Sequence, residues 1–147
     1  MRALALDLGA RRIGVAVSDS RGVLASPHTV LERSGDERAD HDRIAAVVAE
    51  THAEVVVVGL PLSLSGGHGP SAIAARDEAE RLSRRLEVPV ETFDERLTTV
   101  EAQRRRRDRL TARSAGRRAK PAGRQGIDAE AAAVLLDAWL ERRGSPR

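Results

Sequence analysis

Three acidic residues of this chain lie where a regular element gives way to a loop. They are Asp7 in the segment ALALDLG, Glu95 in DERLTT and Asp128 in GIDAEAA. If the fold brings these three positions together, their carboxylates converge on one spot. Carboxylates at that spacing repel one another unless cations lie between them. The pattern predicts a site for one or two divalent ions, Mg²⁺ or Mn²⁺.

Each acid also has a simpler interpretation. Asp7 precedes a glycine, so its side chain could cap a turn, and Glu95 could pair with Arg96 on the surface. For Asp128 alone, the N-cap of the last helix is the favoured interpretation. Asp94 is a weaker candidate for a direct ligand. The metal site is favoured because all three acids fall at the ends of elements that the expected topology places side by side.

The hydrophobic pattern predicts the elements that position these acids. Alternation predicts three strands in succession, and later apolar runs predict alternating helices and strands. The strands are expected at 3–8, 13–18, 23–30, 55–58 and 89–93, and the helices at 36–52, after 70, after the capping box at 98–101, and at 128–142. This order predicts an α/β, RNase H-like fold, a five-stranded mixed sheet flanked by helices, in a single domain spanning residues 1–147.

Charge is unevenly distributed along the chain. The net charge of the 147 residues is +3, yet residues 104–124 hold nine Arg, one Lys and one Asp, a net +9, which leaves the rest of the chain at −6. A solvated basic loop is the simpler interpretation, but the asymmetry favours a loop at about 104–126, flexible in character, that binds nucleic-acid phosphates. Its candidate contacts are Arg104, Arg105, Arg106, Arg107, Arg113, Arg117, Arg118, Lys120 and Arg124.

Composition excludes several other functions. Cys is absent, which excludes disulfides, zinc knuckles and thiol catalysis. Aromatic side chains are limited to Phe93 and Trp139, so a base-stacking platform is not expected. No signal peptide or membrane-length apolar run is present in the sequence, which predicts a cytoplasmic protein with no membrane partner. The Asp-Leu-Gly opening also occurs in two-lobed ATPases and sugar kinases, but this chain is too short for two such lobes.

The motifs together resemble one known family. The segments ALDLG, RIGVAVSD, VGLPL, DERLTT and DAEAA, in this order, are similar to the YqgF family, also called RuvX, over nearly the whole chain. The resemblance implies an RNase H-like nuclease related to the Holliday-junction resolvase RuvC, with bacterial members described as nucleases that mature the precursor of small-subunit ribosomal RNA. It implies that Asp7, Glu95 and Asp128 form the acidic triad and that Arg12 and Thr98 lie near it. The basic loop is longer and richer in Arg than the family pattern.

We therefore expect a phosphodiester-cleaving hydrolase, a metal-dependent endonuclease that processes the 5′ end of precursor 16S rRNA during ribosome biogenesis. Its expected partner is structured RNA. A Holliday junction resolvase acting on four-way, branched DNA is one alternative, and a non-catalytic RNA-binding assembly factor is another. Whether the protein is a monomer or a homodimer stays open, although paired cuts at a junction would require a dimer.

Overall fold

A computed structural model describes the backbone of residues 1–61, 67, 69–98, 103–104, 106–108, 111 and 124–144; the side chains of 124–127 are not described. The strands are β1 (Ala3–Leu8), β2 (Arg12–Ser18), β3 (Ala25–Glu32), β4 (Val55–Leu60) and β5 (Val90–Asp94). They form one sheet in the order β3-β2-β1-β4-β5. The β1–β2 and β2–β3 pairs are antiparallel, and the β1–β4 and β4–β5 pairs are parallel. The expected five-stranded mixed sheet is confirmed.

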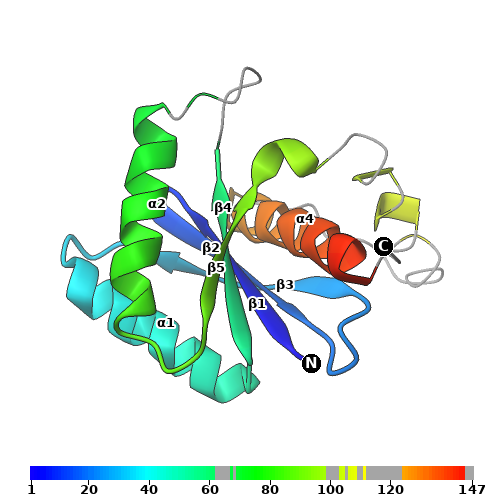
Figure 1. Ribbon diagram of the computed structural model, residues 1–147, viewed down its shortest axis with the longest axis horizontal. Helices are drawn as coiled ribbons and strands as arrows, with labels where there is room; N and C mark the ends of the chain where they lie inside the picture. The colour runs from blue at the N-terminus through cyan, green and yellow to red at the C-terminus, as the bar shows by residue number, and fades with distance from the viewer. Residues whose placement is uncertain are drawn as a thin grey trace.

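Helices cover both faces of the sheet. Helices α1 (Glu37–Thr51) and α2 (Pro70–Ser83) lie on one face, and α4 (Arg124–Gly144) lies on the other (Figure 1). A short 3-10 helix, η1 (Glu95–Leu97), follows β5 directly. Asp36 caps α1 by accepting from the backbone N–H groups of Arg38 and Ala39, and α1 ends at His52 in the left-handed conformation.

Residue size differs between the two faces. Small side chains of β1 and β2 (Ala3, Ala5 and Ala16) pack against α4, whereas Leu4 and Leu6 pack toward α1 and α2. Because successive strand residues point to opposite faces, this assignment follows from the alternation of Ala and Leu in β1. The alanines leave room for α4 to lie close to the sheet.

Two elements have other boundaries than the sequence-based expectation. Strand β3 covers Ala25–Glu32, whereas the strand was expected at 23–30. Helix α4 begins at Arg124, four residues before Asp128, so Asp128 lies inside the helix and is not its N-cap. Residues 103–104, 106–108 and 111 are helical, in the region where a helix after Thr98 was expected, so the described parts of the expected loop at about 104–126 are helical. The rest of that region lies outside the described residues. In the described part of the chain, no helix is long and apolar enough to cross a lipid bilayer.

Candidate metal centre

Strand alternation places the candidate site on the α4 face of the sheet. Asp7 has the same parity in β1 as Ala3 and Ala5, which pack against α4. Glu95 has the same parity as Phe93, the residue of β5 in that same core layer. Asp7 is near the carboxyl end of β1 and Glu95 directly follows β5, and both strands run parallel to β4, so the two acids lie at one edge of the sheet.

Asp128 reaches this edge because α4 touches the sheet at a glycine. Gly14 pairs directly with Asp7 in the β1–β2 register. A methyl group on Gly14 would lie 2.2 Å from the carbonyl oxygen of Asp128, a distance that no real contact permits. Arg12, two residues before Gly14, donates from Nε to Asp128 Oδ2 at 3.1 Å. The first turns of α4 therefore pack directly against the first residues of β2.

Glu95 is held in place by its own turn. Thr98 donates from Oγ1 and from its backbone N–H to the carbonyl oxygen of Glu95, at 2.5 and 3.0 Å. Below it, a Cβ on Gly59 would lie 2.9 Å from Glu95 Oε1. The neighbouring Asp94 is occupied by Arg96, which donates from both its backbone and its guanidinium. Glu95 rather than Asp94 therefore faces the other acids.

The ionised forms of two of these acids are disfavoured. Burial, with repulsion from Asp128, raises the pKa of Asp7. Burial, with repulsion from Asp7 and Asp94, raises the pKa of Glu95. Asp7 therefore interacts electrostatically with both Glu95 and Asp128. In the described part of the chain, however, the three acids are not a group whose ligand atoms all lie within 4.8 Å of one another. A divalent cation would offset both causes, because it replaces lost hydration and neutralises the repulsion. The oxygen-only donor set suits Mg²⁺ or Mn²⁺.

A second cluster has the spacing of a metal site. Among the described residues, Glu37, His41 and Glu78 offer ligand atoms that all lie within 4.8 Å of one another, so this group could hold a metal ion. The candidate ligand atoms, however, already form hydrogen bonds within the protein. Arg85 donates to His41 Nδ1 at 2.9 Å, which leaves the Nε2 proton of a neutral ring to be donated to Glu78 Oε2 at 2.8 Å.

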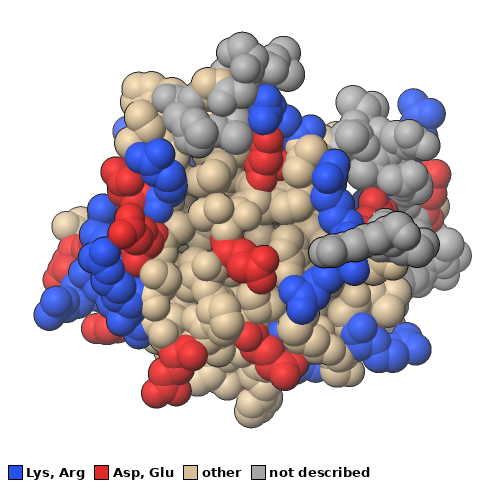
Figure 2. Space-filling view, in the orientation of Figure 1, with Lys and Arg blue, Asp and Glu red and all other residues tan. Residues whose placement is uncertain are grey.

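Arginines neutralise both carboxylates of this cluster. Arg33 donates two hydrogen bonds to Glu78 at 3.1 and 2.8 Å, and Arg81 donates two to Glu37 at 2.6 and 2.9 Å. Figure 2 shows acidic and basic side chains interleaved along the margin formed by α1 and α2. The cluster therefore joins α1, α2 and the residues after β3. Among the described residues, in contrast, no arginine forms a hydrogen bond with the carboxylate of Asp7 or of Glu95.

The described arginines of the expected basic loop at about 104–126 are of two kinds, exposed and buried. Arg104 and Arg107 are exposed, as expected for phosphate contacts. Arg106 is 1% exposed and donates to Asp137 Oδ2 at 2.5 Å, to Glu130 Oε1 at 2.7 Å and to the carbonyl oxygen of Ala25 at 2.7 Å. Its prediction as a nucleic-acid contact is wrong, because the guanidinium is buried and donates to Asp137, Glu130 and the backbone of β3.

Other predicted contacts lie outside the described side chains: Arg105, Arg113, Arg117, Arg118, Lys120 and Arg124. Sequence reasoning missed Arg33 and Arg106, which join elements distant in the sequence. A signal existed for Arg106, since Glu130, Asp137 and Ala133 share one stripe of an amphipathic helix, and buried acids on that stripe require a cationic partner. The sequence did not indicate which of the nearby arginines supplies it.

Comparison with known proteins gives a consistent result at the level of sequence. Residues 1–142 match the RuvX family, described as Holliday junction resolvase. A protein of Anaeromyxobacter dehalogenans strain 2CP-C named "Putative pre-16S rRNA nuclease" is 47% identical over 97% of this chain and 98% of its own length. A protein of the same name from Thermobifida fusca is 50% identical over 94% of this chain and 86% of its own length.

Two solved structures have the same fold as this chain. Thermus thermophilus RuvC in complex with a Holliday junction substrate superimposes with a TM-score of 0.64 at 18% identity, covering 97% of this chain and 96% of RuvC. The fowlpox virus Holliday junction resolvase gives a TM-score of 0.53 at 10% identity, covering 97% and 99%. At these identities the likeness concerns the fold alone, and it confirms the RNase H-like prediction.

Proposed function

This chain belongs to the RuvX family, and from that premise we propose that it is a metal-dependent endonuclease that cleaves precursor 16S rRNA toward its 5′ end. The observation that carries the proposal is the convergence of Asp7, Glu95 and Asp128 on the α4 face, with burial and mutual repulsion opposing the ionisation of the first two. The names of the relatives that are 46–50% identical support precursor rRNA as the substrate.

Asp7, Glu95 and Asp128 are the proposed metal ligands, with Asp7 central because it interacts with both others. Bound divalent metal would supply a Lewis acid that activates water and stabilises the leaving oxygen of a phosphodiester. Arg12 orients Asp128 through its Nε hydrogen bond, and Thr98 fixes the turn that carries Glu95. The protein's contribution is thus to hold three carboxylates in one place.

The test compares the wild type with Asp7→Asn on precursor 16S rRNA and on a four-way DNA junction, each with Mn²⁺, Mg²⁺ or EDTA. Asp42→Asn is the matched control, because Asp42 is an exposed acid on α1 away from the α4 face. We expect metal-dependent cutting of the RNA by the wild type and the control, and at least a hundredfold loss in Asp7→Asn, the scale of lost electrostatic stabilisation of a transition state. Equal cutting by Asp7→Asn, or cutting in EDTA, would contradict the proposal.

The four-way junction is the second candidate substrate, favoured by the description of the matching family as Holliday junction resolvase. Paired cuts in the junction, with the RNA left intact and a dimer in light scattering, would select it. Binding of RNA without cutting in any metal, with Asp7→Asn equal to the wild type in ribosome maturation, would select the non-catalytic assembly factor.

A further inference from the structure

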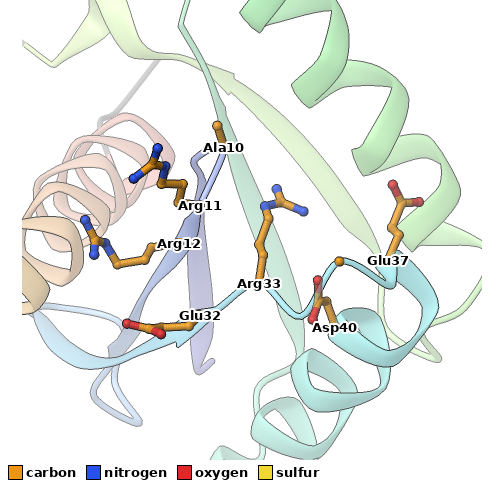
Figure 3. Close-up of a pocket in the computed structure, with 8 residues that line it drawn as sticks. Ala10, Arg11, Arg12, Glu32, Arg33, Glu37 and Asp40 are labelled. Carbon is orange, nitrogen blue, oxygen red and sulfur yellow. The ribbon is translucent and has the colours of Figure 1, made fainter.

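A cleft opens beside the candidate metal centre, at the same edge of the sheet. It has a volume of about 550 Å³ and lies where the β1–β2 turn and the residues after β3 face the start of α1 (Figure 3). A smaller cleft of about 240 Å³ shares Ala10 and Arg33 with it and continues toward α2. Arg12 lines the larger cleft and also touches Asp128, so the cleft begins one side chain away from a proposed metal ligand.

The acidic side chains of this cleft are mostly occupied. Asp40 is 2% exposed and accepts from the backbone N–H and hydroxyl of Ser34 at 3.1 and 2.8 Å. Glu37 is bound by Arg81, whose hydrogen bonds lower the pKa of its carboxyl group. Glu32 is exposed, and Figure 3 shows its carboxylate beneath Arg12 and directed away from Arg33.

The basic side chains, in contrast, retain unused donors. Within the described part of the chain, Arg11 is exposed and its guanidinium donates to no protein atom. Arg12 uses only Nε, for Asp128. Arg33 is held rigid by Gly9 and Glu78, which take three of its five N–H groups. The unsatisfied hydrogen-bonding capacity of the cleft is therefore that of guanidinium donors, on Arg12 and Arg33, which protein contacts hold in place, and on the exposed Arg11, and such donors suit a phosphate.

We propose that this cleft binds a backbone phosphate of the nucleic-acid strand being cleaved, beside the phosphate that reacts, with Arg11 as the principal contact and with Arg12 and Arg33 lining the cleft on either side. The identification of the ligand as a nucleic-acid strand rests on the proposed function. The cleft adds a strand-binding site on the β2–β3 side of the metal centre, independent of the basic segment at 104–124. A strand bound there is aligned across the sheet edge, so that its next phosphate lies over the carboxylates.

The experiment measures binding of a single-stranded RNA and of a four-way DNA junction in the Asp7→Asn background, where the strands stay intact, over a range of salt concentrations. Arg11→Gln is compared with Arg11→Lys and with Arg21→Gln. Arg21 is the matched control, because it is an exposed arginine in the β2–β3 turn at the opposite edge of the sheet. A second measurement replaces single phosphates of the RNA by neutral methylphosphonates, one position at a time.

We expect Arg11→Gln to weaken binding of the RNA by about tenfold at low salt and to reduce the salt slope by about 0.7, the value for one phosphate contact on a single strand. Arg11→Lys should keep the slope, and Arg21→Gln should match the parent. One methylphosphonate position should weaken the parent but not Arg11→Gln, because that contact is already lost. Equal slopes for Arg11→Gln and Arg21→Gln, or no such position, would overturn the proposal.

The two proposals fail separately. If the wild type cuts nothing while Arg11→Gln still changes the slope, the nuclease assignment is wrong and the phosphate site stands. If the wild type cuts RNA and Arg11→Gln binds like Arg21→Gln, the nuclease assignment stands and the cleft is not a phosphate site.

Discussion

Replacing Arg106 with methionine separates a structural role from a role in nucleic-acid binding. Arg106 is 1% exposed and binds Asp137, whose side chain is 6% exposed, and Glu130, whose side chain is 39% exposed. Methionine fills much of the same volume but removes the guanidinium that donates to the buried carboxylate of Asp137. Removing one partner of a buried ion pair costs about 3–5 kcal/mol.

The lower part of that range applies here. Water can solvate the half-exposed Glu130 once Arg106 is gone, and Asp137 still accepts from the backbone N–H of Ala25 at 2.9 Å. We therefore expect Arg106→Met to lower the free energy of unfolding by about 3 kcal/mol, measured by urea denaturation at pH 7. Arg104→Met, which removes an exposed arginine two residues away, should change it by less than about 0.5 kcal/mol.

Binding measurements complete this test. Arg104→Met should reduce the salt slope of RNA binding, and Arg106→Met, at a temperature where it stays folded, should leave the slope unchanged. The double variant Arg106→Met with Asp137→Leu should recover much of the lost stability, because the buried charge is then absent as well. The reasoning is refuted if Arg106→Met costs less than about 1 kcal/mol, or if it changes the salt slope as Arg104→Met does.

Three further predictions concern the carboxylates themselves. Gly14→Ala should cost about 1–3 kcal/mol in urea denaturation and weaken Mn²⁺ binding in calorimetry, because its methyl group displaces the backbone at Asp128; unchanged stability would contradict the close packing. Gly59→Ala should cost less stability but also weaken Mn²⁺ binding, since the atoms it meets are the ends of the side chains of Glu95 and Leu135; wild-type Mn²⁺ affinity would contradict this. The raised pKa of Asp7 means that the folded protein holds this proton more tightly than the unfolded chain, so without metal the stability falls as pH rises from the ordinary carboxyl range through the raised value. In EDTA, Asp7→Asn should therefore be more stable than the wild type at pH 7, with the difference shrinking toward pH 3. Equal stability of the variant and the wild type at pH 7, or a difference that does not shrink toward pH 3, would contradict this.

The positions of the acids were predictable because they follow from strand parity. Alternating Ala and Leu in β1 fixes which face Asp7 points to, and the apolar run of β4 indicates a strand covered on both faces. The resemblance then joined Glu95 and Asp128 to Asp7. The local pattern was sufficient for the face to which Asp7 points and for the burial of β4, because each depends on neighbours within the same strand.

The details that were missed depend on contacts between distant segments. The earlier start of α4 was hidden because Gly126, a weak helix former, stands within its first turn. The burial of Arg106 could not be separated from the exposure of Arg104, since a run of four arginines has no periodicity that distinguishes them. The role of Arg33 depends on Glu78, which lies 45 residues away.

The two glycines beneath the carboxylates also have a consequence for protein design. Gly14 and Gly59 have no side chain to act as a ligand, yet the space above their Cα atoms is where α4 approaches β2 and Glu95 approaches β4. Grafting three acids onto another five-stranded sheet of this topology would therefore fail wherever the host has a side chain at either position. A design that transfers only the proposed metal ligands would omit the two glycines whose lack of a side chain makes this geometry possible.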